Sequence, residues 1–275
     1  GGMMTSINTN VGALNARASA VRATNKMEQA MERLSSGLRV NSASDDAAGL
    51  AVAGKMESQL RGINMSIRNA QDGVGLIQTA ESGVNEIRNM VLRMRELAVQ
   101  MANGIYEDTP DRNNAQLEVT ALINQVTLIA ENTRFNDVAL LDGSFTTVNI
   151  QAGNTTAETI ELSFVDMASS GLSINAVTIA TQSGATAAMG TLDSALETIA
   201  SEQATMGSLI NRLNFSISNQ SKASVMTEQA VGRIMDSDFA TETTNLSKQQ
   251  ILNQAATSML AQANQSKQSI LALLQ

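Results

Sequence analysis

The residues closest to a catalytic arrangement are two adjacent carboxylates, Asp45 and Asp46. Two carboxylates can act as general acid and general base, but only in a pocket with binding partners, which this stretch does not supply. Ser42 and Ser44 precede the pair, and serine is a preferred N-cap. Acidic side chains also stabilise the first turn of a helix. We therefore interpret these residues as a capped helix start, with Ser42 or Ser44 as the cap.

Two further motifs resemble ligand sites only in part. Asp236-Ser-Asp238 offers two carboxylates, but the twelve-residue pattern of a calcium-binding loop is absent. Gly73-Val-Gly75 lacks the third glycine of a dinucleotide-binding loop. The first motif is predicted to be a turn and helix start. The second is predicted to connect one helix, from Asp45 to about Ala70, with the next.

The chain contains neither histidine nor cysteine. Disulfides, cysteine-based zinc sites, thiol nucleophiles and histidine-dependent catalysis are therefore excluded. The sequence has no basic stripe for nucleic acid, no cleavable secretory signal, and no apolar run of the roughly 18 residues needed to span a membrane. We expect no catalytic residue, no cofactor, no metal, no nucleic-acid partner and no membrane insertion.

The elements that organise the chain are long helices, and the most regular pattern runs from Ile77 to Met101. Its apolar residues recur in steps of three and four without a break, which is the seam of a helix packed along its whole length. At 1.5 Å per residue this segment is a rod of roughly 37 Å. The seam comprises Ile77, Ala80, Val84, Ile87, Val91, Met94, Ala98 and Met101.

Two other helices are predicted to pack against this rod. After a turn around Pro110, the only proline, one helix should fold back as an antiparallel hairpin. A later helix, from Leu192, has no local partner and should lie beside the rod. Their seams are Ala115, Val119, Leu122, Val126 and Ile129 in the first, and Leu192, Leu196, Ile199, Met206, Ile210, Leu213 and Ile217 in the second.

Both ends of the chain are amphipathic and weakly charged. The segment from Leu14 to Leu38 has a helical pattern with one phase slip, and Gly37 is a candidate helix end. The segment from Phe239 to Gln275 carries only three charged residues. Because an exposed single helix normally has a more charged outer face, we expect both ends to pack against other chains. The N-terminal seam is predicted at Leu14, Ala18, Val21, Met27, Met31, Leu34 and Leu38.

The middle of the chain has a different composition. Segments 148–152 and 160–164 alternate between apolar and polar residues around Gly153-Asn154, which predicts a β-hairpin. Residues 144–191 are dense in Ser and Thr, which favours an exposed, loop-rich cap. Eight acidic residues and no basic one lie between Arg134 and Arg212, equal to the net charge of −8. Nucleic acid is therefore an improbable partner on charge grounds as well.

Composition agrees with a helical rod. Aromatic residues make up only 2% of the chain, whereas 43% is apolar and fifteen residues are Met. Such a chain suits narrow helix–helix seams better than a thick globular core. The predicted fold class is mainly α: long heptad-patterned helices packed as a rod-like bundle or coiled coil, with a small β-hairpin region at the outer tip.

Several stretches together resemble bacterial flagellin. They are MTSINTNVGALNA, ERLSSGLRVNSASDDAAGLAVA, RNAQDGVGLIQTAE, MRELAVQMAN, NTRFND and, at the end, SMLAQANQSKQSILALLQ. The resemblance covers about 140 residues at the N-terminal side and about 80 at the C-terminal side, with the motifs in the family's order. The part between is shorter than the outer domains of many flagellins, so the chain resembles a minimal-core flagellin.

The resemblance implies a structural subunit of the flagellar filament, which self-assembles through paired terminal helices for swimming motility. It implies secretion in an unfolded state through the flagellar type III apparatus to the extracellular flagellum, and polymerisation under a filament cap. A secretion chaperone would hold the C-terminal segment, and junction proteins would adjoin the filament. An animal Toll-like receptor that senses flagellin is a further candidate partner.

The resemblance also suggests a division of the chain. Residues 1–3 are expected to be a cloning remnant. Residues 4–44 and 239–275 would form the two halves of an inner core. Residues 45–143 and 192–238 would form an outer-core helical rod, and residues 144–191 a hairpin and loop tip.

Candidate site residues fall into three groups. The seam candidates are Val84, Ile87, Val91 and Met94. The assembly candidates on the terminal helices are Leu14, Val21, Leu34, Leu252, Met259, Leu260, Leu271 and Leu274. Arg93, Leu97, Gln100 and Glu118 match positions that contact the immune receptor in flagellins, while Leu92 departs from the Gln found there; alternatively, this stripe packs within the molecule or against the next subunit.

Three other functions compete with this interpretation. A hook–filament junction protein shares terminal helices of this type, but ERLSSGLRVNSASDDAAG and SMLAQANQ fit flagellin better. Some flagellins carry a proteolytic insert with a zinc helix that needs two histidines, and this chain has none. A flagellin-like surface protein that binds glycan or a host receptor is the third alternative.

Overall fold

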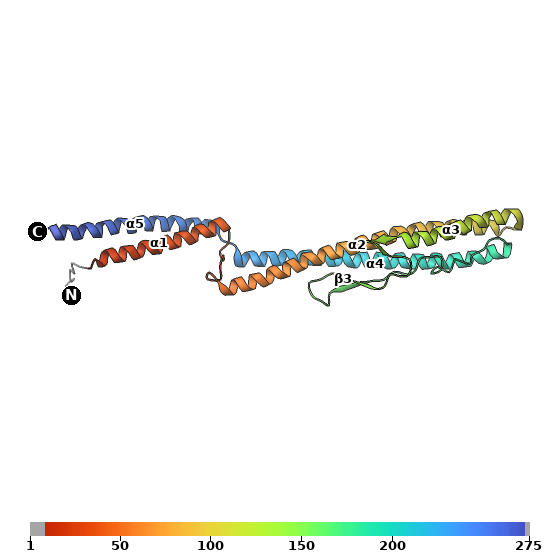
Figure 1. Cartoon of the computed structure of the whole chain (residues 1–275), viewed down its shortest axis with the longest axis horizontal. Helices are drawn as coiled ribbons and strands as arrows, with labels where there is room; N and C mark the ends of the chain where they lie inside the picture. Colours follow the sequence, from red (N-terminus) through yellow and green to blue (C-terminus); the bar gives the residue numbers. More distant parts are fainter. Residues whose placement is uncertain (1–8, 273–275) are drawn as a thin grey trace. The chain divides into compact units, whose positions relative to one another are not determined.

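The computed structural model describes residues 9–272, with the side chains of residues 9–269. It divides into two compact units, residues 1–58 with 226–275 and residues 59–225. The predicted fold class is confirmed, with long helices and two small antiparallel hairpins (Figure 1). The elements are α1 (Val11–Ser36), α2 (Ala47–Met101), η1 (Asp108–Arg112), α3 (Asn113–Asn132), β1 (Arg134–Phe135), β2 (Val138–Ala139), β3 (Val148–Gln151), β4 (Thr159–Leu162), α4 (Gln182–Met235) and α5 (Phe239–Ala272).

In the first unit, α1 and α5 lie side by side (Figure 1). They are antiparallel, because Asn10 contacts Ala263 at one end and Arg33 contacts Glu242 at the other. As predicted, α1 ends at Gly37, whose φ of 73° is a left-handed conformation that glycine adopts without strain.

The seam between α1 and α5 differs from the predicted one. Four of the expected seam residues are exposed, so these predictions were wrong: Leu14, Ala18, Val21 and Met31. The buried and half-buried positions instead form an unbroken series in steps of three and four, without a phase slip. Alanine dominates this series because small side chains let two helices approach closely. The series is Ala13, Ala16, Ala20, Ala23, Met27, Ala30 and Leu34.

α2 is a single helix from Ala47 to Met101, so the predicted connection at Gly73 and Gly75 was wrong. Glycine costs a helix about 1 kcal/mol relative to alanine, but tertiary packing can override that preference. A Cβ on Gly73 would lie 3.3 Å from Ile150 and 3.4 Å from Leu213. The glycine therefore lets the β3–β4 hairpin and α4 pack directly on α2.

The predicted rod seam is confirmed. All eight of the seam residues predicted between Ile77 and Met101 are buried within the second unit. α3 folds back on α2, and its Val119 and Val126 are buried as predicted. Its innermost positions also include Ile123 and Ala130, whereas Ala115, Leu122 and Ile129 are only half-buried. The predicted stripe of α3 was therefore slightly displaced.

α4 lies beside α2 as predicted, although it begins at Gln182 rather than Leu192. Three side-chain contacts join the two helices: Arg95 to Asp193, Gln203 to Asn85, and Ser224 to Asn64. From each of these pairs to the next, the residue number falls along α2 by as much as it rises along α4. The helices are therefore antiparallel with a constant register. The predicted seam residues Leu192, Ile199, Met206 and Leu213 are buried.

The β3–β4 hairpin is confirmed, with Val148 opposite Leu162 and Gln151 opposite Thr159. It does not lie beyond the helix ends, because Asn69 of α2 donates to the Gln151 carbonyl at 3.4 Å. The expectation of an exposed cap was also wrong, because this segment contributes large side chains to the core. They include Phe145, Ile160, Leu162, Phe164, Met167, Ile174 and Ile179.

Candidate assembly and contact surfaces

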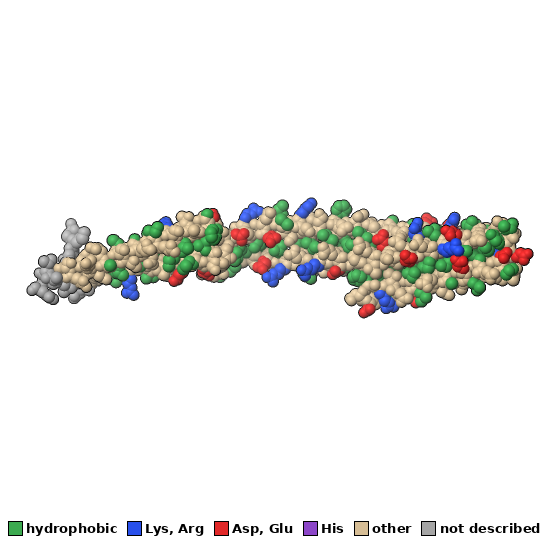
Figure 2. All heavy atoms as spheres, turned by 90° about the horizontal axis from the view of Figure 1, so that it is seen from above, with side chains coloured by type: hydrophobic (Ala, Val, Ile, Leu, Met, Phe, Trp, Pro, Cys, Tyr) green, Lys and Arg blue, Asp and Glu red, His purple; other side chains and the backbone are tan. Residues whose placement is uncertain are grey.

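The paired terminal helices expose large apolar side chains. Leu14 and Val21 of α1 are 56% and 52% exposed, and Met259 of α5 is 66% exposed. Hydrophobic side chains are visible on the surface of this pair in Figure 2. A monomer rarely leaves such residues clustered without a partner. Of the other assembly candidates, Leu252 is exposed and Leu34 and Leu260 are half-buried, while the side chain of Leu271 and all of Leu274 lie outside the described residues.

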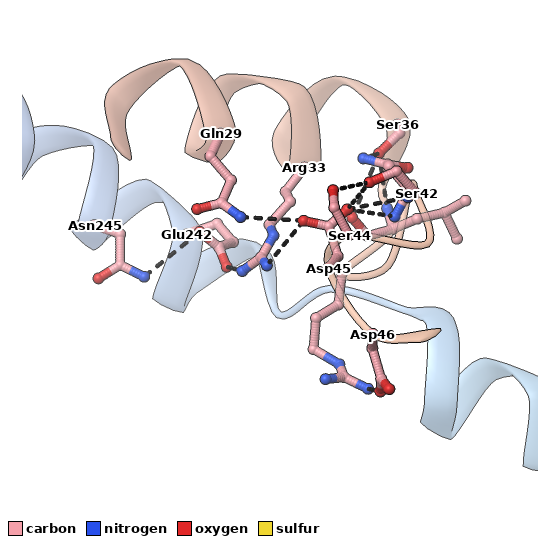
Figure 3. Close-up of polar contacts among 12 residues, drawn as sticks. Gln29, Arg33, Ser36, Ser42, Ser44, Asp45, Asp46, Glu242 and Asn245 are labelled. Atoms are coloured by element: carbon pink, nitrogen blue, oxygen red, sulfur yellow. Dashed lines mark hydrogen bonds and ion pairs between the residues drawn. The ribbon is translucent and has the colours of Figure 1, made fainter. Parts of the chain in front are cut away.

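A polar cluster joins α1, α5 and the segment before α2 (Figure 3). Arg33 Nη1 donates to Glu242 Oε1 at 3.2 Å, and its Nη2 lies 4.0 Å from Asp45 Oδ1. Gln29 Nε2 also donates to Asp45 Oδ1, at 3.2 Å. Glu242 is a buried charge, and such a group is stable only when it is paired. Arg33 therefore ties the end of α1 to the start of α5.

The candidate carboxylates make helix-start hydrogen bonds. Asp46 Oδ1 accepts the Gly49 N–H at 2.8 Å, so Asp46 is the N-cap of α2, and the prediction of Ser42 or Ser44 was wrong. Asp45 Oδ2 instead accepts the Ser42 N–H and hydroxyl, at 3.0 and 2.9 Å. These hydrogen bonds hold the pKa of Asp45 below its ordinary value.

The second carboxylate motif is a helix start, as predicted. Asp238 Oδ1 accepts the backbone N–H groups of Ala240 and Thr241 at the beginning of α5. The Thr241 hydroxyl and these N–H groups lower the pKa of Asp238. Within the described residues, no group of three or more acidic residues is arranged to hold a metal ion.

Arg93, Gln100 and Glu118 are exposed on adjoining faces of α2 and α3. Arg93 Nε donates to Glu118 Oε1 at 2.9 Å, and its Nη1 donates to Glu96 Oε2 at 3.3 Å. The hydrogen bond that Arg93 donates to Glu118, and then the one it donates to Glu96, raise the pKa of Arg93. Gln100 Nε2 donates to the Tyr106 hydroxyl at 3.4 Å. The structure thus brings these three predicted residues to one surface.

Leu97 does not belong to this exposed surface. It is only 5% exposed and forms part of the core of the second unit. Leu97 therefore packs within the molecule, which is one of the alternatives that the sequence left open for this stripe. Helices α3 and α4 both pack against α2, so a wider stripe of α2 is buried than a two-position seam predicts.

Two family models match most of the chain. Residues 7–146 match the bacterial flagellin N-terminal helical region, and residues 189–274 match the bacterial flagellin C-terminal helical region. The chain belongs to the bacterial flagellin family. It is 40% identical to a flagellin of Halalkalibacterium halodurans, over 98% of this chain and 99% of that protein. It is also 38% identical to the flagellar filament 33 kDa core protein of Treponema phagedenis, with the same coverage.

These relatives show that the chain is a structural subunit of the bacterial flagellar filament, which is extracellular. The crystal structure of Bacillus cereus flagellin covers 56% of this chain and 88% of its own, with a TM-score of 0.51 and 30% identity. A putative flagellar hook-associated protein from Vibrio parahaemolyticus shares the fold, with a TM-score of 0.59 over 70% of this chain and 100% of its own, at 13% identity. That likeness concerns the fold alone. Among the described helices of this flagellin, none is long and apolar enough to cross a membrane.

Arg112 is an important residue that the sequence did not reveal. It is buried at the turn between α2 and α3, where its Nε donates to the Met101 carbonyl and its Nη2 to the Asn103 carbonyl, both at 2.8 Å. Its Nη1 pairs with Asp108 at 2.8 Å. One side chain thus satisfies carbonyls at the end of α2. No sequence pattern distinguishes it from a solvated arginine.

Glu202 is the second residue that was missed. It occupies the core face of α4 between Ile199 and Met206 and is 5% exposed. Its Oε1 has no hydrogen-bond partner among the described residues. Burial raises its pKa, partly offset by a hydrogen bond from the Val165 backbone. In the sequence, the predicted seam steps by seven residues from Ile199 to Met206. That gap was the signal that could have indicated a buried polar residue here.

Proposed function

We propose that the exposed apolar surface of the α1 and α5 pair is the principal assembly surface of this filament subunit. The observation that carries this proposal is the exposure of Leu14, Val21, Leu252 and Met259 on the two paired helices. Contact with neighbouring copies would remove this area from water, which contributes about 25 cal/mol per Å². Residues 4–44 and 239–275 form the inner core, and residues 45–143 and 192–238 form the outer core.

The subunit reaches the filament through the flagellar type III apparatus and polymerises under a cap protein. A secretion chaperone holds the C-terminal segment before export, and junction proteins adjoin the filament. The pairing of α1 with α5 supports this route, because helices in proteins gain most of their stability from packing. The chain acts without catalysis, which is supported by the capping roles of Asp46 and Asp238.

Arg93, Gln100 and Glu118 form a second contact surface, which an animal Toll-like receptor or a neighbouring subunit would bind. Their exposure on α2 and α3 supports this role. Arg93 can make charge-assisted hydrogen bonds, which are among the stronger polar contacts at interfaces. Leu97 would contribute by holding α2 in place, since it is buried.

Circular dichroism before and after polymerisation tests the assembly proposal. The helix content should rise on assembly as the terminal segments pair, and electron microscopy should show long filaments. A chain without residues 239–275 should keep the helical signal of the second unit and form no filaments. Filaments without any gain of helix, or filaments from the truncated chain, would contradict the proposal.

A further inference from the structure

The interface between α1 and α5 combines a small apolar face with a polar one. α1 contributes the alanine-rich series described above. The α5 positions that are buried or half-buried follow the same steps of three and four, but half of their side chains are polar. They are Glu242, Leu246, Gln249, Asn253, Ala256, Leu260, Ala263 and Lys267. A seam of this kind is unusual, because polar residues at such positions reduce stability.

The apolar face of α1 does not define a unique register. Ala13, Ala16 and Ala23 are each followed, seven residues later, by another alanine. Sliding α1 by one heptad along α5 would therefore keep most of the same small surface in contact. Alanine packing brings the two helices close together, but it discriminates poorly between registers.

Asn253 makes a contact that only the observed register allows. Its Nδ2 donates to Thr24 Oγ1 at 2.7 Å, and that hydroxyl donates in turn to the Ala20 carbonyl at 3.0 Å. A shift of one heptad would place Arg17 or Met31 opposite Asn253, and neither side chain has a hydroxyl. A polar residue at a seam position can specify register in this way.

The ion pair at the end of the interface discriminates less well. Lys26 lies one heptad before Arg33, so a shifted register would still offer Glu242 a cation. The same shift would leave Asn253 without its hydroxyl partner. A backbone bridge between Leu38 and Asp236, just beyond the two helices, also favours the observed register. We propose that, within the helix pair itself, the hydrogen bond between Asn253 and Thr24 selects the register in which the two terminal helices of one chain pair. This role goes beyond assembly itself, although its main readout uses the proposed filament.

Engineered cysteine pairs can report the register, because the chain has no cysteine of its own. A Cβ on Gly12 would lie 3.7 Å from the Ala263 Cβ, and disulfides need roughly 3.5–4.5 Å between Cβ atoms. Gly12→Cys with Ala263→Cys reports the observed register. Gly12→Cys with Ala256→Cys reports the register shifted by one heptad. Both pairs are placed in the parent chain, in Asn253→Leu and in Asn264→Leu, an exposed asparagine on the same helix that serves as the matched control.

Filaments are grown from parent seeds in a mixture of parent subunits and a minor fraction of the full-length variant. Incorporation then does not depend on the variant alone. After oxidation, intramolecular crosslinks are quantified on non-reducing gels. In the parent, the observed-register pair should exceed the shifted pair by roughly tenfold, since one net hydrogen bond is worth up to about that factor. Asn253→Leu and Thr24→Val should lower the ratio severalfold, whereas Asn264→Leu and Thr24→Ser should keep it.

An unchanged ratio in Asn253→Leu would overturn the inference, as would equal crosslinking by both pairs in the parent. Failure of the parent to form filaments would instead contradict the proposed assembly function. In that case the same crosslinking ratio is measured on the monomer with the same variants. Oxidation there traps whatever fraction of the terminal helices is paired, so the ratio decides the register question separately.

Discussion

Arg93 of α2 and Glu118 of α3 form an exposed ion pair, with Nε donating to Oε1 at 2.9 Å. Exposed pairs of this kind contribute little to stability, because water screens the two charges. Loss of the Arg93–Glu118 pair should therefore affect contacts with other molecules more than it affects folding. Leu97, four residues along α2 from Arg93, has the opposite character because its side chain is buried.

Alanine substitutions should separate these two roles. Arg93→Ala with Gln100→Ala should leave the melting temperature nearly unchanged and weaken both filament formation and signalling through the immune receptor. Leu97→Ala should lower the free energy of unfolding by about 2–5 kcal/mol, because it leaves a cavity in the core. Thermal unfolding, electron microscopy and a receptor reporter assay give the three readouts. Arg88→Ala, an exposed arginine on the same helix, is the control; full assembly and signalling by the double variant would refute both contact roles.

A charge in the rod seam should disrupt the second unit. Val91 is fully buried, so Val91→Asp would place an unpaired carboxylate among apolar side chains, at a cost of several kcal/mol. The melting temperature and the filament yield should both fall sharply. Val99→Asp adds the same charge on α2 at a residue that is 48% exposed, and should melt near the parent temperature. Equal melting of the two variants would contradict the seam assignment.

Glu202 should make stability depend on pH. Burial raises its folded-state pKa above the ordinary value of 4.5, so the folded chain favours the protonated acid. The stability that this protonation provides is complete below pH 4.5 and is lost as the pH rises through the folded-state pKa. At neutral pH the buried carboxylate is therefore a source of instability in the folded chain, which an uncharged side chain of the same shape would remove.

Glu202→Gln should therefore raise the melting temperature at pH 7 and change it little at pH 4. Glu197→Gln, an exposed neighbour on α4, should have no such pH-dependent effect. Melting curves of both variants across this range provide the measurement. A stabilisation by Glu202→Gln that is equally large at pH 4 would point to packing rather than ionisation.

Removal of Glu242 should loosen the pairing of the terminal helices. Glu242→Ala leaves the partly buried Arg33 with only the 4.0 Å contact to Asp45. Breaking a buried ion pair by removing one partner can cost about 3–5 kcal/mol. We expect a higher critical concentration for polymerisation, measured by light scattering, and no change in the melting of residues 59–225. Glu228→Ala, at an exposed position of α4, is the matched control, and an equal effect of both variants would argue against the cluster.

The sequence by itself determined the rod, its seam and the family. The eight seam residues from Ile77 to Met101 share one face of the helix, so periodicity alone identified the buried face of α2. Gly37 and Asp238 marked helix ends through local chemistry, since capping depends on a few neighbouring backbone groups. The family motifs, being long and ordered, likewise needed no structure.

Tertiary structure decided which residues meet across helices. The α1 seam consists of alanines because α5 approaches closely, and a pattern of large residues cannot reveal that approach. Gly73 lies inside a helix, where Ile150 and Leu213 approach to within 3.3 and 3.4 Å of the position that a Cβ would take. Leu97 and Glu202 are buried because more than one helix packs around each. Such burial depends on the positions of elements distant in sequence, whereas periodicity records only the faces of a single helix.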